Sequence, residues 1–398
     1  MISTIRQQYN AAFTTEKYKA FLQELQSKHK DAIDFRVAET PIFIDKKFTN
    51  KILSACESIV DFIVSPDFKE ITNSAIPANV NVPSETLHTH FIAFDFGICQ
   101  NEQGELEPQL IEMQGFPTLF AHQIWHDEVV RHHFPIPEKF SPYLNGFYKE
   151  TYIDLLKHII LGKHSKEEVI LLEILPHQQK TRNDFYCTTD YIGIPVICLT
   201  ELIQEGKNLF YLKDGKKISI KRIYNRIIFD DLQQQSSAIQ DKGKLLLEEL
   251  NVEWVTHPNW FYRISKFTLP FIDHPYVPKT YFLNELEVIP SDLENYVLKP
   301  LFSFAGQGVI IDLTNEDIAQ VKDPENWILQ KKVDYAAVIQ TPDEPAKAEI
   351  RIFYFWEEGA ARPIATNNLV RLSKGKMIGV RYNQNKEWVG GSLAYFEQ

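Results

Sequence analysis

The segment that most constrains the fold is residues 296–312, YVLKPLFSFAGQGVIID. Its first three residues predict a buried strand, and Lys299-Pro300, a loop with Gly306 and Gly308, and a second strand at 309–312 follow. Glycines let backbone N–H groups approach phosphate oxygens, and a lysine adds a compact positive charge. The segment therefore predicts a hairpin that could fold over a polyphosphate, although an ordinary solvated turn has the same composition.

Composition narrows the class of protein and its partners. The chain has 398 residues, 44% of them apolar, and a formal net charge of −11. This length predicts about two to three globular domains, and the negative charge argues against a nucleic acid or a membrane as a partner. The four cysteines have no disulfide-like spacing, and the N-terminal residues lack the apolar stretch of a signal peptide. We therefore expect reduced thiols and a cytoplasmic location.

Residues 90–99 and 108–114 predict a pair of strands with oxygen-bearing side chains. Asp95 stands among apolar residues on the first strand, while Glu112 and Gln114 are two apart on the second and share one face. Carboxylate and amide oxygens suit a hard cation such as Mg²⁺. The alternative is that the carboxylates are solvated at strand ends, as most charged residues are.

Helical and strand patterns organise the flanking segments. Residues 16–28 and 50–64 have helical apolar spacing, and Asn50 is expected to cap the second helix. Residues 166–258 alternate strands and helices and predict a small α/β unit without a dinucleotide-binding glycine motif. The polar residues of this unit that we expect at its surface or at helix ends are Arg182, Asp184, Arg222 and Arg226.

A histidine-rich helix is predicted within residues 120–160. It carries His122, His126, His132 and His133. The first two are four residues apart, a spacing found in many zinc sites, and they suggest a zinc hydrolase. The residue after His122 is Gln123 rather than the glutamate of zinc proteases, so the alternative is a set of ordinary surface histidines.

In the second half of the chain, short motifs occur in a characteristic order. They are Lys266 at a helix start, residues 277–280 (VPKT), Lys299-Pro300 with its glycine loop, residues 330–333 (QKKV), Glu349-x-Arg351, Arg371, Asn383 and Gly390-Gly391. This order resembles that of the ATP-grasp ligases. In that family a helix, an aspartate strand and E-x-N come last, whereas here residues 51–64, Asp95 and Glu112-x-Gln114 come first. The chain therefore resembles the circularly permuted branch, which includes glutathionylspermidine synthase-like and eukaryotic glutathione synthetase-like ligases.

The resemblance implies an α+β or α/β protein with a circularly permuted ATP-grasp fold and a small α/β pre-ATP-grasp domain. Residues 1–165 would form the N-terminal part of the C-lobe, with the metal-binding strands and a helical segment. Residues 166–258 would form the pre-ATP-grasp domain, and residues 259–328 the nucleotide-binding lobe with the glycine loop. Residues 329–398 would complete the C-lobe.

The resemblance also implies the cofactors and the reaction. ATP would be bound by Lys266, Lys299, Gly306, Gly308, Gln330, Lys331 and Val333, and Mg²⁺ by Asp95, Glu112 and Gln114. Arg351 and Arg371 would be catalytic and would stabilise the transferring phosphoryl group and the oxyanion. The reaction would join a small-molecule acid and an amine, amino-acid or peptide-like, through an acylphosphate.

Two departures from the family pattern keep an alternative open. Gln114 stands where the family has asparagine, and Phe304-Ala305 stands where the glutathionylspermidine-type relatives have an R-E pair. The alternative is a permuted ATP-grasp scaffold that binds a nucleotide or a peptide without ligase turnover, because fold does not by itself give function.

Overall fold

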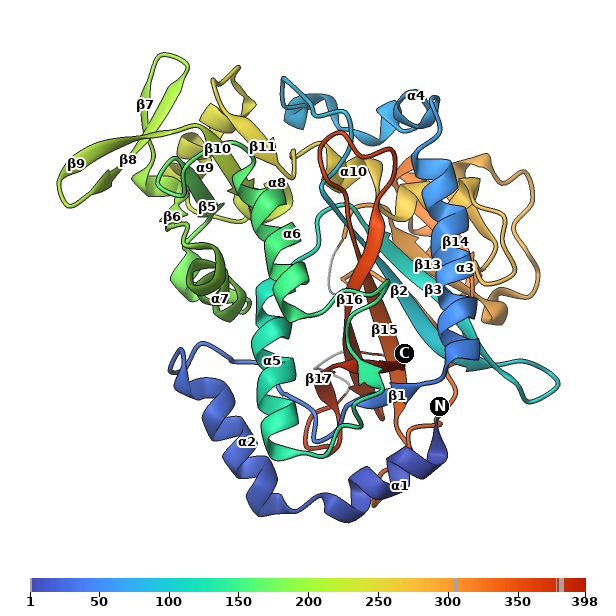
Figure 1. Cartoon of the computed structure of the whole chain (residues 1–398). Helices are drawn as coiled ribbons and strands as arrows, with labels where there is room; N and C mark the ends of the chain where they lie inside the picture. The colour runs from blue at the N-terminus through green and yellow to red at the C-terminus, as the bar shows by residue number, and fades with distance from the viewer. Residues whose placement is uncertain (1, 304–306, 377, 379–382) are drawn as a thin grey trace.

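The computed structural model describes residues 2–303, 307–376, 378 and 383–398. Its centre is a five-stranded antiparallel sheet whose strands come from both ends of the chain (Figure 1). The order is β17 (Gly390–Ser392), β16 (Ile364–Ser373), β15 (Lys347–Phe355), β2 (Phe91–Gln100) and β3 (Leu106–Gln114). The strand pair predicted at 90–99 and 108–114 is confirmed as β2 and β3. Because β2 lies between β3 and β15, residues near position 95 meet residues near position 350.

Helices cover both faces of the central sheet. Phe94 points into the core that α3 (Lys46–Ile63) covers, whereas Phe91 points into the core with α5 (Phe120–His133) and α6 (Lys149–Leu161). The period-two alternation of strand side chains produces these two separate cores. In Figure 1, α3 and the α5–α6 pair accordingly stand on opposite sides of β2, β15 and β16.

Helix α3 begins one turn earlier than its apolar pattern predicted. The carboxylate of Asp45 accepts a hydrogen bond from Phe48 N at 2.9 Å and caps the helix. The expectation that Asn50 is the cap is therefore wrong, and Asn50 lies inside the helix on its exposed face. Phe48 is already buried, so the apolar face starts before residue 50.

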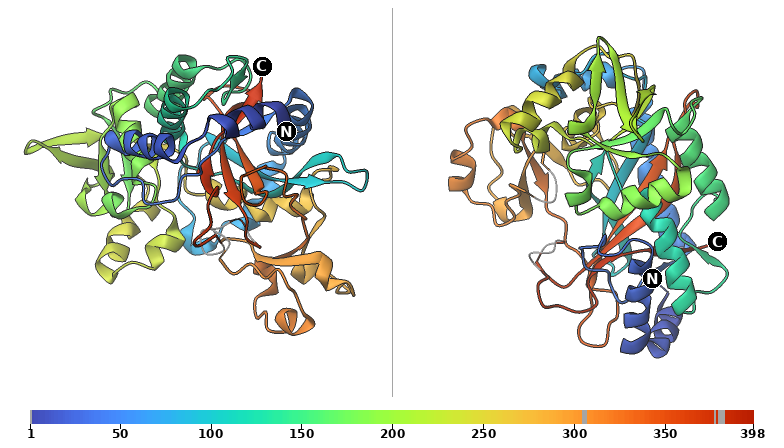
Figure 2. Two further views of the ribbon diagram at one scale, coloured as in Figure 1. Left: turned by 90° about the horizontal axis from the view of Figure 1, so that it is seen from below. Right: turned by 90° about the vertical axis from the view of Figure 1, so that its left-hand side faces the viewer.

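A second sheet is parallel and comes from one continuous part of the chain. Its order is β11 (Glu253–Val255), β10 (Arg222–Asn225), β5 (Val169–Glu173) and β6 (Val196–Cys198), and α7 (Arg182–Ile192) connects the last two. Every residue of β5 is buried, as is usual for a parallel strand with both faces covered. A small antiparallel sheet of β7 (Ile203–Glu205), β8 (Asn208–Lys213) and β9 (Lys216–Ile220) projects away from the remaining chain (Figures 1 and 2).

The segment around the predicted hairpin forms a third sheet. Its order is β12 (Thr280–Phe282), β14 (Trp327–Lys331) and β13 (Tyr296–Pro300). Lys299 and Pro300 lie within β13 rather than after it. The strand predicted at 309–312 is wrong, because only Ile310 pairs with Leu298, as an isolated bridge. The third sheet and β7–β9 stand on opposite sides of the molecule (Figure 1).

An N-terminal arm consists of two helices, and the second of them packs against α5. Helix α1 (Ser3–Ala12) was not predicted, and α2 (Thr15–Ser27) confirms the helix expected at 16–28. The arm leads into β1 (Ile42–Ile44), which pairs with β18 (Ala394–Glu397) beside β4 (Phe140–Ser141). The other α-helices that the structure describes are α4 (Phe68–Ile71), α8 (Phe229–Gln233), α9 (Ser237–Gly243), α10 (Trp260–Arg263) and α11 (Asn315–Ala319). Within the described ranges, no helix combines the length and the apolar character needed to cross a bilayer.

Candidate functional site

Charged side chains meet on one face of the central sheet. Arg351 on β15 lies directly opposite Asp95 on β2, and Glu349 lies opposite Arg371 on β16. Residues two apart on a strand share a face, so Glu349 and Arg351 point the same way. Asp95 is also opposite Glu112 on β3. The register of four strands therefore brings these five residues together on one face of the sheet, in two adjacent cross-strand rows. We call the five residues together the charged row.

The carboxylate of Asp95 is fully buried and is held by both arginines. Arg351 donates from Nε to Oδ1 at 2.6 Å and from Nη2 to Oδ2 at 2.5 Å, and Arg371 Nη2 donates to Oδ2 at 3.1 Å. Arg371 also forms an ion pair with Glu349, which accepts a hydrogen bond from the hydroxyl of Tyr335 at 2.9 Å. Such two-pronged charge-assisted bonds fix the arginines in position. Both oxygens of Asp95 are thus engaged by protein cations.

Glu112 is the carboxylate on which the positive charges of the site converge. Burial by itself would raise the pKa of Glu112, but four nearby cations outweigh it and lower that pKa. They are Lys266, Arg371, Arg351 and Lys299. The Oε1 atom of Glu112 accepts a hydrogen bond from Gln114 Nε2 at 2.8 Å, and Arg351 Nη2 lies 4.0 Å from the same oxygen. Glu112 is therefore ionised and surrounded by cations.

Two buried lysines complete this group of cations. Lys299 Nζ donates to Ile111 O at 3.0 Å and to Gln330 Oε1 at 2.5 Å, while Lys266 Nζ donates to Ser303 O at 2.7 Å. The two side chains are 8% and 5% exposed, respectively, and burial lowers the pKa of Lys299 to about 8. Burial also lowers the pKa of Lys266, against the attraction of Glu112. Among the described residues, both ammonium groups donate hydrogen bonds to neutral oxygens. Cations in such an environment are suited to an anionic ligand.

Three buried polar atoms around these cations have no hydrogen-bond partner within the described part of the chain. They are Gln330 Nε2, Arg371 Nε and Ser303 Oγ. Buried donors without partners cost free energy, so they mark places where an acceptor belongs. A ligand rich in acceptor oxygens, such as a polyphosphate, would satisfy them, and the two lysines provide the matching charge.

The predicted cation ligands are brought together, but they are not equally available. Glu112 and Gln114 lie side by side at the end of β3. Asp95 lies opposite Glu112, yet its oxygens are bound by Arg351 and Arg371. Glu112 and Gln114 fit a hard cation, because they offer carboxylate and amide oxygens next to a candidate phosphate site. Asp95 fits a hard cation only if an arginine moves.

The remaining residues predicted to bind a nucleotide lie at the end of β14, just after it, or in the glycine loop. Lys331 ends β14 with an exposed side chain, and its N–H donates to Lys279 O at 2.8 Å. Val333 follows two residues later and is half-buried. Gly308 has a φ of +75°, a conformation that favours glycine. Gly306 lies outside the described residues, as do Phe304 and Ala305.

The histidine pair expected at the surface is instead buried in α5. His122 and His126 are 2% and 3% exposed, and burial lowers the pKa of His122 to about 4. The Nδ1 atom of His122 is 2.7 Å from Asn183 Nδ2, so it is occupied as an acceptor. Among the described residues, the pair belongs to no group of three metal-ligating side chains. The interpretation of this pair as surface histidines is therefore wrong, and the described residues offer no third ligand that would support a zinc site.

Two further residues of the site region were not selected as site residues from the sequence. Glu173 ends β5 and Arg226 follows β10, at the carboxyl edge of the parallel sheet, where α/β proteins commonly bind ligands. Burial raises the pKa of Glu173 to about 8. Arg226 is 7% exposed and donates to Pro117 O at 2.7 Å, but its Nε has no partner within the described part of the chain. The signal that could have identified them is their position directly after buried strands.

This structure corrects the expectation for the other polar residues of the same unit. Arg222 is 1% exposed rather than at the surface, and Arg226 is also buried. Asp184 does cap a helix, but it caps α5 rather than its own helix, because it accepts from the N–H groups of Ala121 and His122 at 2.9 and 2.8 Å. Of these four residues, only Arg182 remains partly exposed at the surface, where it forms an ion pair with Asp34 at 2.7 Å.

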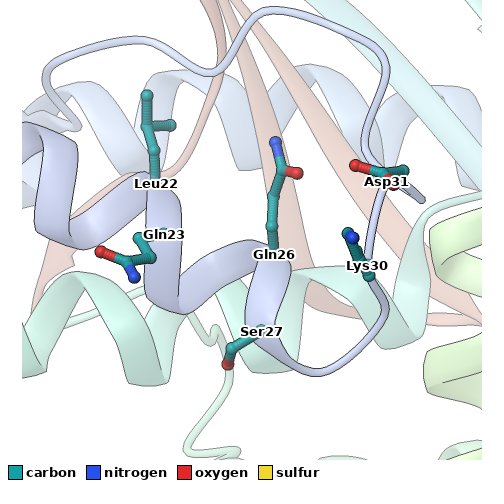
Figure 3. A pocket seen from close by; sticks show the side chains of 6 residues that line it. All are labelled: Leu22, Gln23, Gln26, Ser27, Lys30 and Asp31. Atoms are coloured by element: carbon teal, nitrogen blue, oxygen red, sulfur yellow. The ribbon is translucent and has the colours of Figure 1, made fainter.

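A surface hollow of about 560 Å³ lies elsewhere, on α2 and the turn after it (Figure 3). Its lining residues are Leu22, Gln23, Gln26, Ser27, Lys30 and Asp31. It shares none of them with the charged row or with the two lysines. This hollow is therefore separate from the candidate site.

Of three comparisons with known proteins, the comparison of structures found a similar fold. No protein-family model matches the sequence, and no curated protein matches it. In structure, the chain is similar to a glutathione synthetase-like effector from Globodera pallida, solved in its apo form. The TM-score is 0.59 and the sequence identity 11%, and the alignment covers 90% of this chain and 93% of that chain. The likeness concerns the fold alone, and the chain has a mixed α/β, glutathione synthetase-like fold.

Proposed function

We propose that this protein is an ATP- and Mg²⁺-dependent ligase that joins a carboxylate to an amine through an acylphosphate. The observation that carries the proposal is the convergence of Lys266, Lys299, Arg351 and Arg371 on Glu112. Transfer of a phosphoryl group needs little more from a protein than positioned cations and a metal site. This cluster offers both at one place.

We further propose that the fold is a circularly permuted ATP-grasp fold. In support, β2 from the first third of the chain pairs with β15 from the last part, and β3 pairs with β2 on its other side. The metal-binding and arginine-bearing strands therefore share a sheet although they lie at opposite ends of the sequence. The likeness to a glutathione synthetase-like protein also supports this assignment.

In this proposal, Lys266 and Lys299 hold the phosphates, and Gln330 positions Lys299. The adenine lies along residues 330–333, with Lys331 and Val333, and Gly306 and Gly308 belong to the loop over the phosphates. Glu112 and Gln114 hold Mg²⁺, which when bound neutralises phosphate charge. Arg351 and Arg371 stabilise the transferring phosphoryl group and the oxyanion.

Asp95 has a different role from the one that its motif implies. Because both of its oxygens accept hydrogen bonds from Arg351 and Arg371, we assign it as the residue that positions these arginines. The metal then depends mainly on Glu112 and Gln114.

The acid and the amine are small molecules that we place at the carboxyl edge of the parallel sheet. Arg226 carries a buried N–H that has no partner among the described residues and is suited to a carboxylate, and Glu173 lies on the neighbouring strand. Residues 116 and 117 connect this edge to Gln114, because Phe116 lies 4.7 Å from the guanidinium of Arg226 and Pro117 accepts from it. An acid held there would lie next to the proposed metal and phosphate site.

The first experiment is a thermal unfolding assay with ATP and Mg²⁺. The parent protein should be stabilised by the pair of ligands, and Lys299→Met should lose this effect because it removes a buried phosphate contact. The exposed Lys322→Met of the same lobe is the matched control and should respond like the parent. If Lys299→Met responds like the parent, the phosphate site lies elsewhere.

A second candidate function is a nucleotide- or peptide-binding scaffold without turnover. The engagement of Asp95 by two arginines favours it, because one predicted metal ligand is then unavailable. ADP release should be measured with pairs of amino acids and small peptides. The ligase releases ADP with at least one pair, whereas the scaffold is stabilised by ATP and releases none.

A further inference from the structure

A group of three metal-ligating side chains lies between the N-terminal arm and the end of α5. His132 Nδ1 and His133 Nε2 are each 2.8 Å from Glu24 Oε2. One ligand atom from each residue lies within 4.8 Å of the other two, and the described residues contain this one group of its kind. These residues are separate from the charged row, and the proposed ligase function leaves them without a role.

Buried contacts on both sides hold these side chains in place. Phe21, one turn before Glu24 on α2, is 2% exposed, and its ring meets the ring of His133 edge-on at 6.3 Å. Trp125 Nε1 on α5 donates to Leu25 O on α2 at 3.0 Å. The alignment of the two helices therefore does not depend on the contact between Glu24 and the histidines. The ligand set is positioned in advance, which lowers the cost of binding an ion.

We propose that Glu24, His132 and His133 bind a divalent transition-metal ion of the zinc type. Two imidazole nitrogens and one carboxylate oxygen are a ligand set that Zn²⁺ commonly accepts, with water as the fourth ligand. The side chain of His132 is 69% exposed, so an ion and its water can reach the site from solvent. Mg²⁺ and Ca²⁺ prefer oxygen ligands and do not suit it.

The geometry also indicates what the ion does. It links Glu24 on α2 to the last residues of α5, and so fastens the N-terminal arm to the layer of helices that covers the central sheet. The expected effect of the metal is on stability, with no direct part in the reaction proposed above.

The test uses tag-free, full-length protein treated with EDTA and then titrated with ZnCl₂ in a calorimeter. One zinc ion should bind per chain, and its binding should raise the unfolding temperature. MgCl₂ should do neither. Glu24→Gln should weaken zinc binding by roughly 100-fold or more, since even outer-shell changes cost about 10–100-fold.

Matched variants distinguish zinc binding by these three residues from non-specific zinc binding by surface histidines. His133→Ala should weaken zinc binding as Glu24→Gln does, and the double variant should bind zinc no more tightly than either single variant. His158→Ala is the control, because His158 forms an exposed pair with Glu357 at 3.0 Å and, among the described residues, belongs to no group of three metal-ligating side chains. Three results would each overturn the proposal. They are loss of zinc binding in the control, unchanged zinc binding in Glu24→Gln, and the absence of stoichiometric zinc binding in the parent protein.

Discussion

Within the charged site, burial changes the acid–base behaviour of Lys299. Burial lowers its pKa to about 8, partly offset by the negative charge of Glu112. The ammonium form is therefore only partly populated just above neutral pH. An anionic ligand favours this charged form, so ligand binding and protonation of Lys299 are linked.

We predict that ATP binding in the presence of Mg²⁺ weakens as the pH rises from about 7 to 9, since the amine loses the proton that attracts phosphate. Near pH 8, binding should be accompanied by proton uptake. Calorimetry in buffers with different ionisation enthalpies measures that uptake. Lys299→Arg keeps its charge throughout this range and should show a flatter pH dependence. An equally steep decline in this variant would assign the titration to another group.

Asp95 and Glu112 face each other across β2 and β3, but they should respond differently to substitution. Asp95→Asn removes the acceptor charge that positions Arg351 and Arg371, so catalysis should fall by roughly 100-fold. The concentration of Mg²⁺ that is needed for half-maximal stabilisation by ATP should change little. Glu112→Gln should raise that concentration substantially. If Asp95→Asn raises it equally, then Asp95 is a metal ligand.

At the scale of elements, the start of α5 depends on a residue from another helix. Leu119 precedes the helix with a φ of +78° and offers no capping side chain. Asp184 of α7 replaces a local cap by accepting from the N–H groups of Leu119, Ala121 and His122 at 3.0, 2.9 and 2.8 Å. Helix α5 follows β3 directly, so this contact also fixes the chain that leaves Gln114.

Replacing Asp184 by Ala should lower the free energy of unfolding by about 2–4 kcal/mol, because three backbone donors lose their acceptor. Urea unfolding measures this loss. Asp190→Ala on the same helix is the control. Asp190 forms a partly exposed ion pair with His29, and its loss should cost less than about 1 kcal/mol. Equal losses in the two variants would mean that Asp184 does not cap α5.

Helices and strands were predicted well where the sequence pattern within the element is enough to identify it. The alternation at 90–99 and 108–114 identified β2 and β3, because each residue's face follows from its neighbours in sequence. The predicted strand at 309–312 failed for the opposite reason. Strand formation there depends on a partner strand, and only Ile310 has one.

At the scale of the whole molecule, Arg222 connects three parts of the chain. Its guanidinium is 1% exposed and pairs with Glu253 at 2.7 Å and with Glu358 at 2.6 Å. It also donates to the carbonyl oxygens of Ile159 and Ile160 at 2.9 and 3.1 Å. One side chain thus joins the parallel sheet to α6 and to the turn between β15 and β16.

Arg222→Met should lower the free energy of unfolding by about 2–4 kcal/mol, because two buried carbonyls and two carboxylates lose their partner. Calorimetry should also show a broader or split unfolding transition than in the parent protein, as the parallel sheet separates from the central sheet. Arg362→Met removes an ion pair of Glu57 that is about half-exposed and should cost less than about 1 kcal/mol. If Arg222→Met lowers the free energy of unfolding by as little as Arg362→Met, then these parts are held together by apolar packing alone.

Sequence order and periodicity by themselves determined the types of most elements and the mixed α/β class of the fold. Only tertiary structure decided which charges meet. Asp95 and Arg351 are separated by 256 residues, and the register of β2 against β15 makes them partners. Burial was likewise decided by packing: the helical spacing of His122 and His126 put them on one face, but nothing local shows whether that face is covered. Lys299 was recognisable as a candidate from its motif, whereas the depth that lowers its pKa comes from the strands and helices around it.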